Sequence, residues 1–398
     1  MSRTRNHVED LRGASRLAIE ATTGITALVE AMHRTIAGGP DLLGRPLEGA
    51  AGALLAPVYG GIRAVTRLIG AGIDGALAQL APLLGDRGSM AEHEAVLAVL
   101  NGVLGDYLDE THNPLAITMR LRAGGHPLVL QPDALAVALP QATGKLLVLV
   151  HGSCVNDLQW SRRGHDHGAA LARDLGYTPV YLHYNSGLHI SRNAEAFAGL
   201  LEQLVGAWPV PLDELVILAH SMGGLVSRSA CGFGEAADHT WRRRLTKLVC
   251  LGTPHHGAPL ERGGNWIDVL LGSSRYSAPL ARLGQIRSAG VTDLRFGNVR
   301  HQDWEGRDRF EHAEDARTPL ALPAGVASFA IAAALADAAG TSAETDGLVP
   351  VTSALGRSDR PEFALGFHED RQWIAYGTGH LDLLDRADVY AKIASWLG

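Results

Sequence analysis

The sequence predicts an α/β protein whose mostly parallel central sheet is covered by helices on both faces. Short apolar runs alternate with segments of helical periodicity from residue 145 to the end of the chain. The runs 145–150, 215–219 and 247–252 are apolar almost throughout, as strands buried on both faces are. Repeated strand, helix, strand units form parallel sheets, and functional residues collect at the carboxyl ends of their strands.

The composition is that of a soluble, folded protein. The 398 residues suffice for a large core, and 46% are hydrophobic while 19% are charged. The formal net charge of -7 gives no electrostatic reason to expect nucleic acid as a partner. No C-x-x-C or H-E-x-x-H spacing organises the histidines into a metal site. Cys154, Cys231 and Cys250 are odd in number, which favours reduced thiols in the cytoplasm.

The first quarter of the chain has a different pattern. Residues 14–108 carry a helical period that predicts about three helices, the last of them near 96–107. We therefore divide the chain into an N-terminal helical region, 1–114, and a second domain, 115–398. The apolar faces of these helices must be covered, and packing on the insertion at about 258–320, a homodimer contact or a peripheral membrane contact would cover them.

No segment predicts a membrane-spanning helix. The basic residues at the amino terminus are not followed by an apolar stretch, so we expect no secretory signal. Residues 49–62 are too few to cross a bilayer, and 318–336 contain two prolines. We expect a cytoplasmic protein, which could still rest on a membrane surface.

The elements of the second domain follow from changes of period. From Leu115 to Leu121 apolar and polar residues alternate, which predicts a first strand, and ALAVALP at 134–140 predicts a second. Further strands are predicted at 145–150, 178–184, 215–219, 247–252, 325–335 and 372–376, and helices at about 165–175, 191–206, 222–231 and 386–397.

The decapeptide LVILAHSMGG, 215–224, ends a buried strand with a histidine, a serine and two glycines. Ala219 to Gly223 match the G-x-S-x-G nucleophile elbow, with alanine at the first small position. In that motif the serine occupies a strained turn between strand and helix, and large neighbours two residues away do not fit. Ser221 is therefore the candidate nucleophile. The alternative is a serine that only caps a helix.

An earlier strand provides a second element of the same site. KLLVLVHGSCVND, 145–157, is a strand that ends in His-Gly and small polar residues. In serine hydrolases of this architecture the corresponding loop gives one amide to the oxyanion hole, and the residue after the nucleophile gives the other. Those residues are Ser153 and Met222. The alternative for the His-Gly pair is an ordinary turn.

Serine needs a general base, and the base needs an acid to orient it. The order along the chain is nucleophile, acid, histidine in proteins with such an elbow. Asp346 follows the strand 325–335 and His380 follows the strand 372–376, so both belong at the edge that carries Ser221.

Other polar residues compete for these roles. His255 and His256 follow the strand after the elbow, which is the wrong position for the base, and we expect them to line a pocket or lie on the surface. Asp382 is expected to cap the last helix, and Asp370 lies before its strand, at the far edge. His220 cannot turn onto its neighbour's hydroxyl and is expected to pack.

With these motifs identified, the chain resembles a known family. LVHG, AHSMGGLV, LGTPHHGAP, DGLVPVTSA and GHLDLL, in this order, are similar to segments of bacterial lipases and esterases of the α/β-hydrolase fold. AHSMGG is similar to the elbow of small Bacillus-type lipases. The resemblance covers roughly residues 116–398. It implies a Ser221, Asp346, His380 triad, an oxyanion hole from Ser153 and Met222, and an acyl-enzyme mechanism that uses no cofactor.

The chain is larger than such small lipases. Residues 258–320 form a long insertion, which we interpret as a cap or lid, the alternative being a surface excursion without a gating role. The expected activity is hydrolysis of small-molecule or lipid esters with apolar acyl groups. An acyltransferase or thioesterase would use the same triad, and a non-catalytic binding protein could keep the same fold.

Overall fold

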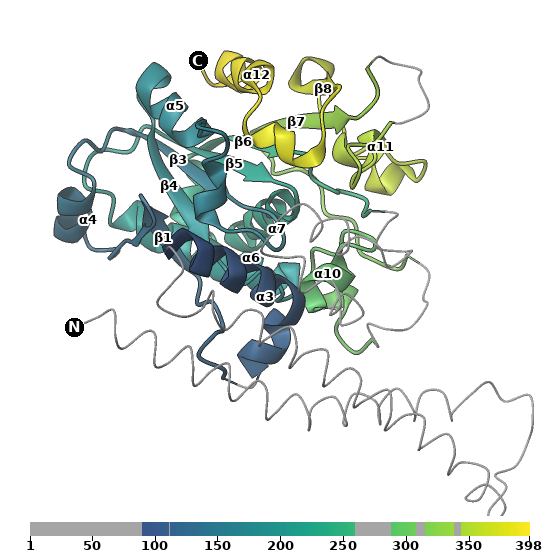
Figure 1. The fold of residues 1–398 in the computed structure, drawn as a ribbon, viewed down its shortest axis with the longest axis horizontal. Coiled ribbons are helices and arrows are strands. Elements are labelled where there is room, and N and C mark those ends of the chain that lie inside the picture. Colours follow the sequence, from purple (N-terminus) through teal and green to yellow (C-terminus); the bar gives the residue numbers. More distant parts are fainter. Residues whose placement is uncertain (1–89, 111, 259–287, 308–314, 338–343) are drawn as a thin grey trace, which may run out of the picture.

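An eight-stranded sheet organises the chain, with the strand order β2-β1-β4-β3-β5-β6-β7-β8 (Figure 1). The computed structural model describes residues 90–110, 112–258, 288–307, 315–337 and 344–398. The strands are β1 (Arg120–Ala123), β2 (His126–Pro127), β3 (Lys145–Val150), β4 (Thr178–His183), β5 (Glu214–His220), β6 (Leu245–Leu251), β7 (Ala327–Ala334) and β8 (Gln372–Tyr376). Strand β1 pairs antiparallel with β2 and β4, and β4, β3, β5, β6, β7 and β8 are parallel. This is the α/β-hydrolase fold that the sequence predicts.

Helices cover both faces of the sheet. The α-helices are α3 (Met90–Glu110), α4 (Pro132–Ala138), α5 (His167–Leu175), α6 (Ile190–Gly206), α7 (Met222–Ala236), α10 (Ala289–Asp293), α11 (Val351–Ala354) and α12 (Ala387–Leu397). Short 3-10 turns are η1 (Asp157–Trp160), η2 (Thr240–Arg243), η4 (His301–Asp303), η5 (Pro361–Phe363), η6 (Glu369–Arg371) and η7 (His380–Leu384).

The alternation of side chains along each strand divides the core into two layers. Leu146 and Val148 of β3 share a buried cluster with α3, α6 and α7, whereas Leu147 and Leu149 share another with α5 and α12. Figure 1 shows these two sets of helices on opposite sides of the sheet. Because both faces are covered, a continuous apolar run is the sequence pattern that these strands require.

The six predicted parallel strands are confirmed, but two predictions nearer the amino terminus are wrong. Residues 134–140 are not a strand, since Pro132–Ala138 form helix α4. Of the strand predicted from Leu115 to Leu121, only the short β1, Arg120–Ala123, forms. Backbone groups before β1 form hydrogen bonds with a side chain of α3 instead of with a neighbouring strand. The side chain of Asn101 donates to the carbonyl of Leu115 at 2.8 Å and accepts from the amide of Ile117 at 2.8 Å.

The predicted helix near 96–107 is confirmed as α3, which contributes Val96, Leu100 and Leu108 to the core that β3 also enters. The predicted helices before it lie outside the described residues, and the domain boundary at residue 115 stays a prediction. Within the part of the chain that the structure describes, no helix is both long enough and apolar enough to span a membrane.

The described part of the insertion packs on the domain. Asp293 of α10 accepts from the backbone amide of Ile190 at 2.9 Å and contacts the His189 ring at 3.1 Å. The Trp304 ring stacks on His189 with ring centroids 3.8 Å apart. The remainder of 258–320 lies outside the described residues, so the lid stays a prediction.

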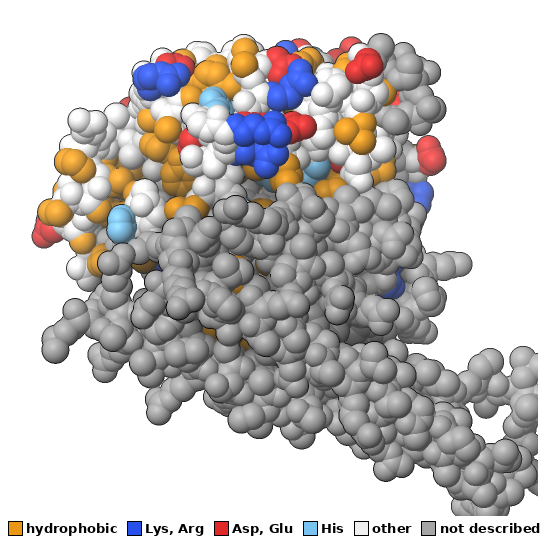
Figure 2. Space-filling model, viewed as in Figure 1, with side chains coloured by type: hydrophobic (Ala, Val, Ile, Leu, Met, Phe, Trp, Pro, Cys, Tyr) orange, Lys and Arg blue, Asp and Glu red, His pale blue; other side chains and the backbone are white. Residues whose placement is uncertain are grey.

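On the face in Figure 2, basic and acidic side chains of the described residues lie interspersed.

Candidate active site

Ser221 lies on a strained turn between β5 and α7. Its backbone has φ 55° and ψ -126°, a conformation that non-glycine residues seldom adopt. The turn also brings backbone segments very close together. A Cβ atom on Gly223 would lie 2.5 Å from the carbonyl oxygens of Val150 and His151, and one on Gly152 would lie 2.9 Å from the Ser221 Cβ. Small residues are therefore required here by contact with the loop after β3.

Asp346 and His380 meet in a buried hydrogen bond. The His380 Nδ1 and an Asp346 carboxylate oxygen are 2.6 Å apart, and each residue is 4% exposed. The other oxygen of Asp346 accepts from the amides of Leu348 and Val349 at 2.9 and 2.7 Å. The backbone amide of His380 also donates to the carbonyl of Asp346 at 3.1 Å. The carboxylate can accept only from Nδ1–H, which leaves Nε2 as the basic nitrogen of the neutral ring.

His220 connects the elbow to the histidine loop. Its Nε2 lies 3.1 Å from the carbonyl oxygen of His380, and the two imidazole rings have centroids 4.7 Å apart. Because a carbonyl only accepts, Nε2 carries the proton. Burial and the nearby His380 hold the pKa of His220 well below its ordinary value, so the ring is neutral. The structure therefore brings His380 to the edge where Ser221 lies.

The sequence does not predict this role for His220, whose position directly before the elbow serine indicates only packing. Its hydrogen-bond acceptor is a carbonyl 160 residues later, and nothing in the local sequence reveals that partner.

The two predicted oxyanion-hole residues, Ser153 and Met222, directly follow Gly152 and Ser221, the two residues whose close approach is described above. Met222 is the first residue of α7, so its amide is among those that the helix itself does not satisfy. Nδ1 of His151 lies 2.8 Å from the carbonyl oxygen of Gly152 and donates to it. In the planar trans peptide between Gly152 and Ser153, the carbonyl oxygen and the amide hydrogen point in opposite directions. Because the carbonyl oxygen faces His151, the amide of Ser153 points away from His151.

His151 is held firmly in this tautomer. Its ring stacks on Tyr184 with centroids 4.2 Å apart, and its Nε2 accepts from the backbone amide of Tyr184 at 3.4 Å. Complete burial lowers the pKa of His151 to about 3, although its bond to Gly152 acts in the opposite direction. The imidazole is thus neutral near pH 7 and donates through Nδ1.

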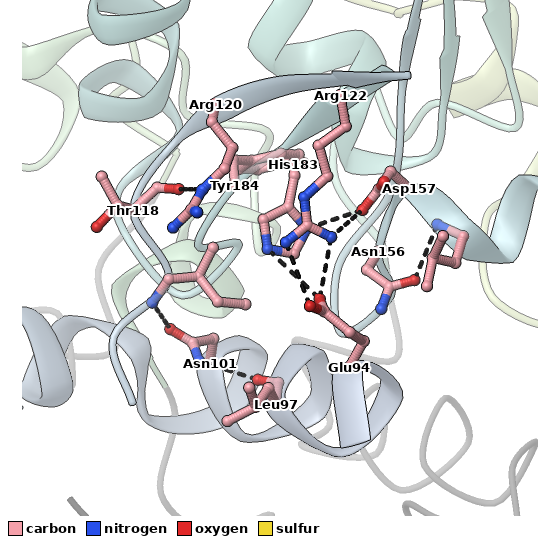
Figure 3. Close-up of polar contacts among 12 residues, drawn as sticks. Glu94, Leu97, Asn101, Thr118, Arg120, Arg122, Asn156, Asp157, His183 and Tyr184 are labelled. Carbon is pink, nitrogen blue, oxygen red and sulfur yellow. Dashed lines mark hydrogen bonds and ion pairs between the residues drawn. The ribbon is translucent and has the colours of Figure 1, made fainter. Parts of the chain in front are cut away.

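A buried charged network joins β1, α3, β4 and η1 (Figure 3). Arg122 of β1 pairs with Glu94 of α3 at 3.1 Å and with Asp157 of η1 at 3.2 Å. His183 of β4 lies 2.9 Å from the same Asp157 oxygen. Hydrogen bonding from His183 and the charge of Arg122 lower the pKa of Asp157, against the effect of burial. The network ties α3 to the loop that carries Ser153.

The competing candidates lie elsewhere. His255 is fully buried in a small pocket beside Phe367, and His256 is half-buried in the same pocket, as expected of pocket-lining residues. Asp382 does not cap the last helix. It accepts from the amide of Gly379 at 3.2 Å and so caps the turn η7 that begins with His380. That prediction was wrong because η7 precedes α12. Asp370 lies in η6 before β8, at the far edge.

Side chains of the types that bind metals are dispersed over the described residues, and the thiols are buried. Among the described residues, no three His, Cys, Asp or Glu side chains gather as a metal site would require. Cys154, Cys231 and Cys250 are buried, and burial raises the pKa of Cys154 to about 11 and of the other two to about 12. Such thiols remain protonated and are poor nucleophiles.

Residues 200–318 match the family of the PGAP1-like alpha/beta domain. No curated protein sequence matches the chain. Similar solved structures include the mature form of a Bacillus licheniformis lipase, 17% identical with a TM-score of 0.43, covering 70% of this chain and 98% of that one. A Pyrococcus furiosus esterase is 11% identical with a TM-score of 0.39, covering 65% and 82%. Lipase B of Aspergillus fumigatus is 12% identical with a TM-score of 0.40, covering 72% and 57%.

The family match and the sheet order agree with the resemblance drawn from the sequence motifs. The resemblance to lipases and esterases of the α/β-hydrolase fold is therefore confirmed at the level of the fold. The catalytic roles of Ser221, Asp346, His380, Ser153 and Met222 stay a proposal.

Proposed function

We propose that this protein is a serine hydrolase of carboxylic esters that acts through an acyl-enzyme. One observation carries the proposal. The buried bond of 2.6 Å between Asp346 and His380 lies beside the strained turn of Ser221, which His220 links to the carbonyl of His380. The lipases and esterases among the similar structures are consistent with this chemistry.

In the proposed mechanism His380 Nε2 takes the proton of the Ser221 hydroxyl as the oxygen attacks the ester carbonyl. Asp346 holds the ring in the required tautomer and stabilises the imidazolium that forms. The amides of Ser153 and Met222 stabilise the negative charge on the carbonyl oxygen, and the amino end of α7 adds to this effect. The alcohol leaves with a proton from His380, and water then hydrolyses the acyl-enzyme by the same steps.

Esters with apolar acyl groups are the proposed substrates, as small molecules or as lipids. The test uses p-nitrophenyl esters of graded acyl length with the parent chain and with Ser221→Ala. We expect turnover in the parent and its loss by several orders of magnitude in the variant. Ser395→Ala is a matched control because that exposed hydroxyl only bonds the carbonyl of Lys392 within α12.

Labelling with a fluorophosphonate provides an independent measurement. The reagent should modify Ser221 in the parent and in Ser395→Ala, but not in Ser221→Ala. Turnover that survives in Ser221→Ala would eliminate the proposed nucleophile. Absence of both turnover and labelling in a correctly folded parent would favour a binding protein that kept the fold.

A further inference from the structure

The small pocket that His255 and His256 line also contains basic side chains, and none of the candidate catalytic residues lines it. Arg228 of α7, His255 and His256 after β6, and Arg317 form its polar lining, and Phe363 is among its apolar residues. The free space between them is about the size of one water molecule. All the lining residues belong to described parts of the chain.

Arg228 is a buried cation with unused hydrogen-bonding capacity. It is 4% exposed, and its Nη1 donates to the carbonyl oxygen of Leu320 at 2.8 Å. Its Nε has no hydrogen-bond partner, and no carboxylate within the described ranges forms an ion pair with it. Burial, together with the like charge of Arg317, lowers the pKa of Arg228 to about 10, which still leaves the guanidinium charged near neutral pH. A buried charge of this kind is strongly unfavourable unless something compensates it.

Asp303 and Asp315, whose charges act on basic residues of this pocket, are already engaged. Both oxygens of Asp303 accept from backbone amides, at 2.7 to 3.0 Å. Asp315 pairs with Arg317 at 3.3 Å and with Arg360 at 3.8 Å. The charge of Arg228 is therefore not balanced by a direct contact with either acid.

His255 adds a second buried donor. It is 0% exposed, and neither ring nitrogen has a hydrogen-bond partner in the described chain. Burial and the charge of Arg228 hold the pKa of His255 well below its ordinary value. The neutral imidazole has one N–H to donate. A buried guanidinium and a buried imidazole with unused donors thus line the same space.

We propose that Arg228 and His255 bind one small inorganic anion, of the size and charge of chloride, in this pocket. The anion balances the charge of Arg228 and accepts from the unused donors. A space the size of one water molecule excludes phosphate and organic carboxylates. Arg228 belongs to the helix that begins beside Ser221, and His255 follows β6, so the bound anion joins α7 to the segment after β6. Arg317, near the end of the insertion, lines the same pocket.

Thermal unfolding of the full chain in sodium chloride, compared with sodium gluconate at equal ionic strength, tests this proposal. Gluconate is too large for the pocket. A chloride concentration 100-fold above the dissociation constant should raise Tm by about 5 °C relative to gluconate, and the rise should saturate. Arg228→Gln should lose this chloride-dependent rise. Arg243→Gln should keep it, because Arg243 is exposed and pairs with Asp238.

Crystals of the parent protein soaked in sodium bromide give a measurement that needs no variant. Anomalous density for bromide between Arg228 and His255 is expected. If Arg228→Gln does not fold, His255→Phe replaces it, with the same expected loss. Equal unfolding curves in chloride and gluconate, or a pocket that holds only water in bromide, would overturn the proposal. An equal loss of the chloride effect in Arg243→Gln would also overturn it.

Discussion

Lowering the pH from 7 to 5 should destabilise the folded chain strongly, because histidines are buried in their neutral form. Burial lowers the pKa of His151 to about 3 and of His167 to about 4. Both groups bind a proton near pH 6.5 when the chain is unfolded. The stability they contribute is therefore complete above pH 6.5 and is lost progressively as the pH falls towards the folded pKa.

The size of the effect follows from this difference in proton binding. Between pH 7 and pH 5 the unfolded state gains about 2 kcal/mol of protonation free energy for each such histidine, while the folded state gains almost none. His151 and His167 together account for a loss of about 4 kcal/mol, a large part of the stability of a typical domain. His220 and His255, whose pKa values are also lowered, act in the same direction.

Urea unfolding at pH 7 and pH 5 measures the effect in the parent and in His167→Gln. The ring of His167 is bonded to His165 at 2.8 Å and to the carbonyl of Leu383 at 2.9 Å, so the variant loses stability at both pH values. The decisive quantity is the difference between the free energies of unfolding at pH 7 and at pH 5. In His167→Gln this difference should be smaller than in the parent by about 2 kcal/mol. His368→Gln, with an exposed side chain, should leave it unchanged. Equal stability of the parent at pH 7 and pH 5 would refute the argument.

Three further predictions concern the site and its support. Asp346→Asn should lower kcat by about 10⁴-fold while circular dichroism shows the fold intact, and near-normal turnover would move the acid elsewhere. Gly223→Ala should destabilise by about 1–3 kcal/mol in urea unfolding, whereas Gly199→Ala, with open space around its Cβ position, should stabilise α6 by about 0.5–1 kcal/mol. Arg122→Met should cost about 3–5 kcal/mol by the same measurement, because it removes the only guanidinium that the described residues pair with the buried Asp157 and the half-buried Glu94; a cost no larger than that of Arg120→Met would contradict this.

The central strands could be predicted because their environment is uniform. Every residue from Leu215 to His220 of β5 is buried, so the local run of apolar side chains carries the whole signal. Helix α4 shows the opposite case. ALAVALP alternates like a strand, yet Val137 is 82% exposed, and Pro132 at the start of the helix was the overlooked indication. Period two is a weak signal in a short segment rich in alanine, which favours helices.

The positions of the candidate triad could be predicted from chain order, since each residue follows a strand of the parallel sheet. The residues that hold the site could not be predicted in this way. His220 acts through the carbonyl of His380, and Asn101 takes over the backbone bonds of a segment that alternates like a strand. Such contacts join positions that are distant in sequence, and each depends on a fold that must already be present.

The strain at Ser221 explains why so many contacts converge on it. A non-glycine residue in such a conformation costs about 1–3 kcal/mol and persists only when its surroundings determine it. Here the amide of Ser221 donates to Leu251 of the next strand at 2.8 Å, and its carbonyl accepts from Gly224 at 3.1 Å. Gly152 packs against its side chain, and His220 is anchored to the histidine loop. These contacts preorganise the turn, and relaxing it would require breaking hydrogen bonds to strand β6 and to the loop that carries His380.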